Sequence, residues 1–301
     1  MRTQWTGLGT ALITPFTKGG GLDELAVKKL ARRQIDAGVH FLVPCGTTGE
    51  VPTLSASERR RVVELVVEES GGRVPVLAGA GGYNTQEVIH AAAEMATIGV
   101  QGLLSVTPYY NKPTQEGLYQ HYRAIANSTP LPIVMYNVPG RTGCNMEPAT
   151  VVRLSAIANI VAVKEASGNV TQMAEIIRAV PPDFLVLSGD DALTVPIMAI
   201  GGRGLISVAS NEAPAEMSQM VEAAEHGDFA AARQLHQRLM PLMQVNFVES
   251  SPGPVKFAMA AMGLCEECYR LPMVSPKAAT KEKVLGVLRE LGFPLVAGSH
   301  A

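Results

Sequence analysis

Short apolar runs alternate with longer stretches of helical period along most of this chain. Eight runs of four or five residues have the length and composition of buried strands: residues 9–13, 41–44, 74–78, 102–106, 133–136, 160–164, 184–188 and 204–207. Between them apolar residues recur every three or four positions, for example in residues 24–37, 57–69, 85–98, 114–126 and 213–224. The pattern predicts eight strand–helix units within the first ~225 residues.

This alternation determines the expected fold class. Uninterrupted apolar strands joined by crossover helices indicate a parallel sheet that is covered on both faces. Eight such units match an α/β (β/α)8 TIM barrel better than an open doubly wound sheet. No Gly-x-Gly-x-x-Gly segment follows the first strand, which argues further against a dinucleotide-binding fold.

The last part of the chain has a different pattern. Residues 228–248, 254–262 and 281–291 have helical period, and no clear strand accompanies them. We therefore expect a (β/α)8 catalytic barrel in residues 1–225 and a C-terminal helical region in residues 226–301, packed on the barrel or used in assembly. No linker or low-complexity segment separates the two parts, so we expect one folded unit.

Composition narrows the class of protein. Of the 301 residues, 47% are hydrophobic and 17% charged, which favours a sizeable core over disorder. The formal net charge of -2 gives no reason to expect nucleic acid or an anionic membrane as a partner. There is no run of about 18 apolar residues, and residues 1–5 lack the apolar stretch of a signal peptide. These features predict a soluble, cytoplasmic protein.

The cysteines do not change that prediction. Four cysteines are too few for a disulfide framework in a chain of this length. Cys265 and Cys268 have redox-like or zinc-like spacing, but no second pair accompanies them, so ordinary reduced thiols are favoured.

Two strands end in chemically useful side chains. Lys164 closes the apolar run 160–164, and Tyr136 closes the run before it. Desolvation of an ammonium group lowers its pKa, and a neutral amine can attack a carbonyl group to form a Schiff base. A lysine that merely marks where a strand reaches solvent is the alternative. Together the two residues predict a carbonyl-binding site at the strand ends.

Polar loops after other strands add candidate binding groups. In GTTGE (residues 46–50), two glycines and the hydroxyl groups of Thr47 and Thr48 suit a small carboxylate, although a plain helix-entry loop is the alternative. In TPYYNKP (residues 107–113), one of two tyrosines can reach a site or a neighbouring subunit, or simply pack there. Arg141 can bind a carboxylate through two parallel hydrogen bonds; an arginine that is merely solvated is the alternative.

Asp190 and Asp191 end the segment SGDD (residues 188–191) and raise the question of a metal. No histidine lies nearby in a ligand pattern, and both residues precede a helical run. Capping of that helix is therefore the simpler interpretation, and we expect no metal site.

The motifs GTTGE, TPYYNKP, YNVPGRTG, VKEASGN and SGDD together resemble those of the dihydrodipicolinate synthase/N-acetylneuraminate lyase family of pyruvate-handling Schiff-base barrels. The resemblance extends from residues 9–11 to residues 254–257, and the YYN and GRTG segments look like the synthase branch. It implies a lyase that condenses pyruvate with L-aspartate 4-semialdehyde in lysine and diaminopimelate biosynthesis. It also implies a homotetramer built as a dimer of dimers.

The resemblance also implies a role for each matching residue. Lys164 forms the imine with pyruvate. Tyr136, Thr47 and Tyr110 form a proton relay, with Tyr110 supplied by an adjacent subunit. The other matching residues bind substrate: Thr48 with Thr47 holds the pyruvate carboxylate, Arg141 holds the carboxylate of the semialdehyde, and Gly189 and Ile206 line the pocket. Because an imine is itself an electron sink, neither a metal nor a cofactor is expected.

One group of positions departs from the family pattern. Members that are inhibited by lysine bind it at a subunit interface through polar and histidine side chains just after GTTGE. The corresponding residues here are Val51, Pro52, Ala56 and Arg59, and Tyr83 replaces an asparagine, while Glu87 and Tyr109 remain. Because Val51 and Pro52 offer no side-chain hydrogen bonds, we expect weak or absent inhibition by L-lysine.

Two other functions remain open. Another pyruvate aldolase or a dehydratase of the same family would act on a sugar acid, for which hydroxyl and acidic side chains would suit the position of Arg141 better. A catalytically idle paralogue that senses a small acid is the alternative from a different class. The intact set of Lys164, Tyr136, Thr47 and Tyr110 argues against it.

Overall fold

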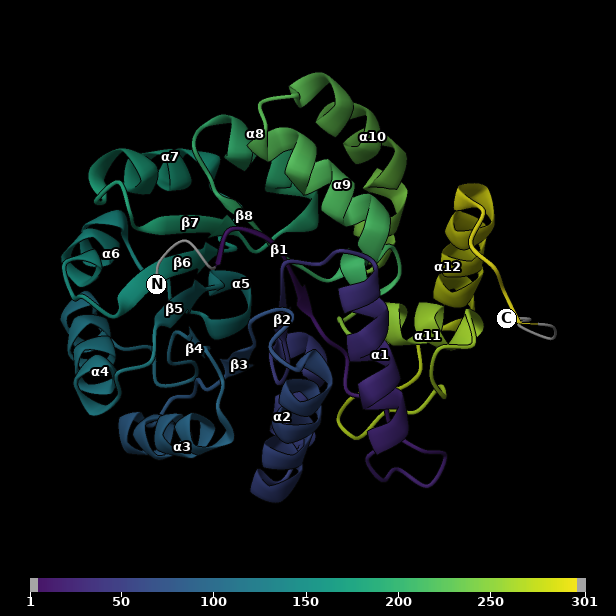
Figure 1. The fold of residues 1–301 in the computed structure, drawn as a ribbon, viewed down its shortest axis with the longest axis horizontal. Coiled ribbons are helices and arrows are strands. Elements are labelled where there is room, and N and C mark those ends of the chain that lie inside the picture. The colour runs from purple at the N-terminus through teal and green to yellow at the C-terminus, as the bar shows by residue number, and fades with distance from the viewer. Residues whose placement is uncertain (1–4, 297–301) are drawn as a thin grey trace.

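The fold is that of a computed structural model, which describes residues 5–296. The N-terminal segment that was compared with a signal peptide lies outside this range, except for its last residue, Trp5. Eight parallel strands form its centre (Figure 1): β1 (Gly7–Ala11), β2 (Phe41–Val43), β3 (Leu77–Gly79), β4 (Gly102–Val106), β5 (Ile133–Asn137), β6 (Ile160–Glu165), β7 (Leu185–Ser188) and β8 (Gly204–Ser207). Their order is β2-β1-β8-β7-β6-β5-β4-β3, and a parallel bridge between Leu42 and Val76 joins β2 to β3. The predicted TIM barrel is confirmed.

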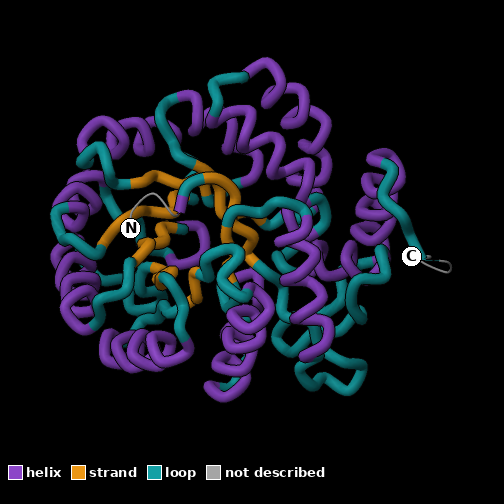
Figure 2. Tube along the Cα trace, viewed as in Figure 1, coloured by secondary structure: helices purple, strands orange, loops and turns teal. Residues whose placement is uncertain are grey.

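Helices surround the strands, as the tube trace shows (Figure 2). They are α1 (Glu24–Asp36), α2 (Ala56–Ser70), α3 (Thr85–Ile98), α4 (Gln115–Ser128), α5 (Pro139–Thr142), α6 (Pro148–Ser155), α7 (Val170–Ala179), α8 (Thr194–Ala199) and α9 (Pro214–Glu225). Local sequence sets where they begin: Ser55 and Glu58 form a complete capping box at the start of α2, and the side chain of Asn84 caps α3.

The interior of the barrel is a packed apolar cluster to which every strand contributes. Its members on β5 and β6 include Val134, Tyr136 and Ala162. Because side chains alternate across a strand, Lys164 faces the same interior as Ala162, two residues before it. The apolar runs that predicted the strands therefore exist because both faces of each strand are buried, one by the barrel interior and one by the helices.

The C-terminal region consists of α10 (Phe229–Val245), α11 (Gly253–Ala261) and α12 (Ala278–Leu291). α10 packs against α9 and α8 of the barrel, and α12 packs on α10 and α11. Leu239 and Leu285 of this region belong to the same buried cluster as Leu8 of β1, which agrees with one folded unit. The expected division after residue 225 falls between α9 and α10, and as a domain boundary it stays a prediction.

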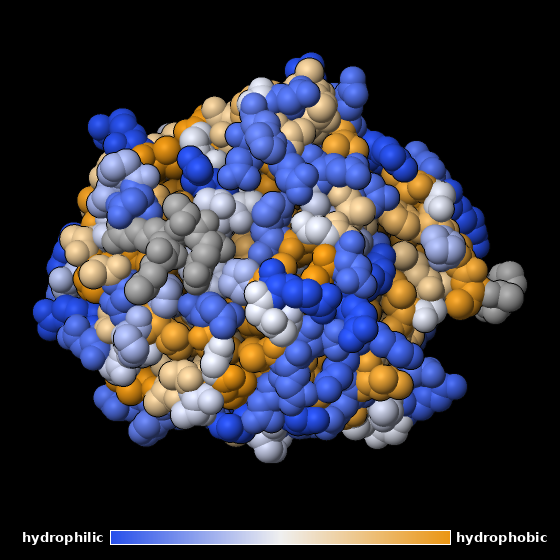
Figure 3. All heavy atoms as spheres, in the orientation of Figure 1, coloured by the Kyte–Doolittle hydropathy of each residue, from blue (hydrophilic) through white to orange (hydrophobic). Residues whose placement is uncertain are grey.

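On the face seen in Figure 3, hydrophilic and hydrophobic side chains are interspersed. Among residues 5–296, no helix combines the length and apolar character needed to cross a membrane.

Candidate active site

Lys164 and Tyr136 lie side by side at the carboxyl ends of neighbouring strands. The register of β5 on β6 pairs Tyr136 directly with Lys164. The side-chain nitrogen Nζ of Lys164 lies 4.2 Å from the centre of the Tyr136 ring. The two side chains that the sequence singled out are thus brought together where TIM barrels carry their active sites.

The surroundings of Lys164 favour its neutral form. Its side chain is buried, and this burial lowers its pKa to about 7; the negative charge of Asp191 opposes the shift and the positive charge of Arg141 adds to it. Gly189 makes room for this side chain, because a Cβ atom at Gly189 would lie 3.0 Å from Cε of Lys164. At neutral pH a large fraction of this amine is therefore available as a nucleophile.

Tyr136 is linked to the turn that follows β2. Burial raises the pKa of Tyr136, while Arg141 and a side-chain hydrogen bond with Thr47 lower it. Thr47 begins a single 3₁₀ turn, Thr47–Gly49, and the next residue, Glu50, has a left-handed backbone with φ 52°. Thr48 of the same turn is buried. Thr47 therefore lies where its hydroxyl group acts on the hydroxyl group of Tyr136.

A network of polar side chains fixes the ends of β5 and β6. Glu165 follows Lys164 and is fully buried; its carboxylate accepts hydrogen bonds from Asn137 Nδ2 at 2.9 Å and from Gln172 Nε2 at 3.2 Å. Asn137, the residue after Tyr136, also accepts a hydrogen bond from the backbone N–H of Met146 at 2.9 Å. The predictions from sequence missed this network, although its signal was present: a polar residue directly follows each of the two site residues.

The expected role of SGDD was right for one aspartate and wrong for the other. Asp190 caps the short turn after β7 by accepting a hydrogen bond from the N–H of Ala192. Asp191 is buried, and its carboxylate instead accepts hydrogen bonds from Ser207 Oγ and from the N–H groups that follow β8. Residues 5–296 contain no group of three or more His, Cys, Asp or Glu side chains placed to hold a metal ion.

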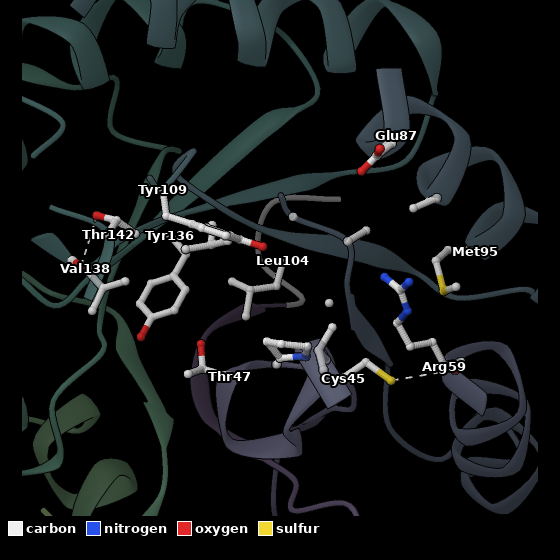
Figure 4. A pocket seen from close by; sticks show the side chains of 18 of the residues that line it. Cys45, Thr47, Arg59, Glu87, Met95, Leu104, Tyr109, Tyr136, Val138 and Thr142 are labelled. Carbon is white, nitrogen blue, oxygen red and sulfur yellow. Dashed lines mark hydrogen bonds between the residues drawn. The ribbon is translucent and has the colours of Figure 1, made fainter. Parts of the chain in front are cut away.

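A cavity of about 540 Å³ lies beside Tyr136 and Thr47, and both residues line it. Figure 4 shows Tyr136 and Thr47 toward one end of it and Arg59 and Glu87 toward the other. Arg141, on α5, also lines the cavity, and its Nη2 donates a hydrogen bond to the carbonyl oxygen of Ser251 at 3.3 Å.

The other predicted site residues have different positions. Lys164, Thr48, Gly189 and Ile206 do not line this cavity, and the side chain of Ile206 is part of the barrel interior. Tyr110 does not line it either: its side chain is 89% exposed, and its backbone has φ 71°. Its neighbour Tyr109 does line the cavity. Within one chain, therefore, Tyr110 does not join the group around Lys164.

The sequence of this chain matches the family model described as "Dihydrodipicolinate synthetase family" over residues 4–291. The chain belongs to this family. A relative from Koribacter versatilis named 4-hydroxy-tetrahydrodipicolinate synthase is 53% identical, and the match covers 95% of this chain and 96% of the relative. A relative of the same name from Acidobacterium capsulatum is 50% identical and covers 96% of each chain.

Solved structures of the family agree with the fold. The crystal structure of dihydrodipicolinate synthase from Aquifex aeolicus superimposes with a TM-score of 0.95 at 42% sequence identity, covering 97% of this chain and 99% of that one. A structure of the Acinetobacter baumannii dihydrodipicolinate synthase complexed with pyruvate has a TM-score of 0.95 at 40% identity, with 96% and 99% of the two chains covered.

Proposed function

We propose that this chain is a 4-hydroxy-tetrahydrodipicolinate synthase, a lyase that condenses pyruvate with L-aspartate 4-semialdehyde in lysine and diaminopimelate biosynthesis. Family membership and the names of the relatives support the activity. The single observation that carries the mechanism is the buried amine of Lys164, with a pKa of about 7, beside Tyr136.

The first half of the reaction takes place at Lys164. Its neutral amine attacks the keto carbon of pyruvate, and loss of water from the resulting carbinolamine gives the imine. The imine withdraws electrons, so the methyl group of the bound pyruvate loses a proton and an enamine forms. No metal or cofactor is part of the proposal, because the imine itself provides the electron sink.

The second half joins the two substrates. The enamine carbon attacks the aldehyde carbon of the semialdehyde and the aldehyde oxygen takes up a proton. The amino group of the semialdehyde then attacks the imine carbon, which closes the ring and releases Lys164. Tyr136, Thr47 and Tyr110 carry the protons that these steps take up and release. The influence of Thr47 on the pKa of Tyr136 supports the first link of this relay.

The remaining site residues bind the substrates. Thr47 and Thr48 hold the carboxylate of pyruvate, with the main chain of Ile206 near it and Gly189 beside Lys164. Arg141 holds the carboxylate of the semialdehyde. Its place on the cavity wall and the influence of its charge on both Lys164 and Tyr136 support this assignment.

The relay implies an assembly. In a single chain Tyr110 is highly exposed and does not line the cavity, so it takes part only if an adjacent subunit supplies it. We propose a tight dimer that exchanges Tyr110, two such dimers forming a homotetramer, and a cytoplasmic location.

An assay with pyruvate and a panel of aldehydes tests the proposed substrate. We expect turnover with L-aspartate 4-semialdehyde and none with polyol aldehydes that lack the carboxylate. Efficient turnover of a sugar-derived aldehyde instead would indicate a sugar-acid aldolase of the same family. Lys164→Ala is the matched inactive control.

A further inference from the structure

The turn that carries Thr47 and Thr48 ends in a strained residue. Glu50, directly after this turn, has φ 52° and ψ 36°, a conformation that residues other than glycine rarely adopt. Thr14 Oγ1 donates a hydrogen bond to the carbonyl oxygen of Gly49 at 2.7 Å, which holds the turn from the side of β1. A left-handed glutamate persists only where its surroundings hold it.

The side chain of Glu50 is held by a residue 206 positions later in the chain. Lys256, on α11 of the C-terminal region, places Nζ 2.5 Å from Glu50 Oε1. Both side chains are buried, with exposures of 0% for Lys256 and 1% for Glu50. Nζ of Lys256 also lies 4.2 Å from the centre of the Phe16 ring. Glu50 Oε2 has no hydrogen-bond partner within the described residues, and Lys256 forms the direct ion pair of this carboxylate.

The same C-terminal segment reaches a second loop of the site. Ser251, shortly before α11, accepts the hydrogen bond from Arg141 through its carbonyl oxygen. Residues 251–256 thus contact both segments to which substrate carboxylates are assigned: the turn after β2 and helix α5 after β5.

We propose that Lys256 is a positioning residue for the reaction, which acts through Glu50 to hold the turn that carries Thr47 and Thr48. Lys256 itself touches no substrate. The inference rests on the proposed function, because it assigns pyruvate to this turn. It gives the C-terminal region a part in the active site beyond packing and assembly.

The test measures imine formation and stability in matched variants of the full chain. Borohydride trapping at increasing pyruvate gives the concentration for half-maximal imine, and thermal unfolding gives the midpoint. Lys256→Met leaves the Glu50 carboxylate buried and unpaired, so we expect a lower midpoint and a half-maximal concentration raised about tenfold or more. Lys281→Met is the control, because Lys281 pairs with Glu267 at 2.7 Å in the same region, away from the turn. Its half-maximal pyruvate concentration should equal that of the wild type.

The double variant Glu50→Met/Lys256→Met separates positioning from mere stability. Two apolar side chains of similar length leave no unpaired charge, so the midpoint should recover. We expect the half-maximal pyruvate concentration to stay raised, because nothing then holds the turn. Recovery of both values would overturn the positioning role, and so would a wild-type value in Lys256→Met.

The trapping experiment distinguishes an error in the proposed function from an error in the role of Lys256. If the wild-type protein traps no pyruvate at all, the Schiff-base mechanism is wrong, and the positioning role is wrong with it. If the wild type and Lys256→Met trap pyruvate with the same concentration dependence, the function stands and only the role of Lys256 is overturned.

Discussion

The Nζ atom of Lys164 lies 4.2 Å from the centre of the Tyr136 ring because the register of β5 on β6 pairs these two residues directly. Each is the inward-facing residue at the carboxyl end of its strand. The buried pair of Glu165 and Asn137 lies one residue further along the same two strands, again in register, and joins them by a hydrogen bond of 2.9 Å. The proposed nucleophile and proton donor are thus positioned by backbone pairing and not by flexible loops.

The pKa of Lys164 sets the pH dependence of imine formation. Burial lowers this pKa to about 7, so the neutral fraction of the amine rises roughly tenfold between pH 6 and pH 8. The rate of imine formation in the free protein should rise over this range and level off above pH 8. Stopped-flow measurement with pyruvate gives the profile. A rate that continues to rise toward pH 10 would indicate an ordinary, solvated lysine.

The same burial has a cost in stability. Between pH 7 and 10.5 the unfolded chain binds a proton at Lys164 that the folded protein does not bind, so the penalty grows as the pH falls through this window and is complete below pH 7. Lys164→Met removes the buried amine and should raise the free energy of unfolding by roughly 2 kcal/mol at pH 6. Denaturant titrations at several pH values test this. The gain should shrink toward pH 10, and a gain that does not depend on pH would contradict the explanation.

Arg141 should affect the two substrates differently. Loss of a charged hydrogen-bonding partner of the semialdehyde carboxylate should raise KM for that substrate by about 10- to 100-fold in Arg141→Ala. Because the Arg141 charge also lowers the pKa of Lys164, the pH profile of imine formation should move to higher pH. Arg153→Ala, an exposed arginine paired with Glu116 at 3.0 Å, is the control and should change neither quantity.

Inhibition by L-lysine is expected to be weak or absent. Val51, Pro52 and Ala56 line the same cavity as Arg59 and Glu87, and none of the three provides a side-chain hydrogen bond for an amino acid. Activity should therefore be unchanged at micromolar concentrations of L-lysine. Steady-state assays with added L-lysine decide the matter, and an inhibition constant in the micromolar range would show that the expectation is wrong.

Most of the barrel was predictable because both faces of its strands are buried and leave continuous apolar runs. All eight predicted strands overlap observed ones, but their ends differ. The third was expected at residues 74–78 and lies at Leu77–Gly79, because before it the chain makes only an isolated bridge between Val76 and Leu42. Helices as short as α5 and α8 were not identified individually, since four or six residues are too few to show a helical period.

The candidate site was predictable only where local sequence carries the signal. Lys164 and Tyr136 each end an apolar run, so their positions alone singled them out. Asp191 and Lys256 gave no comparable signal, because their partners are determined by the tertiary fold: Asp191 binds the loop after β8, and Lys256 pairs with a glutamate 206 residues away. Tyr110 is exposed in the single chain, so its part in the proposed relay requires a neighbouring subunit, which local sequence does not describe.

Borohydride reduction in the presence of pyruvate, followed by mass spectrometry of the intact chain and of its peptides, tests the Schiff-base mechanism most directly. We expect one reduced pyruvate adduct per chain, located on Lys164 and absent from Lys164→Ala. No increase in mass, or an adduct on another lysine with Lys164 unmodified, would contradict the assignment of Lys164 as the nucleophile.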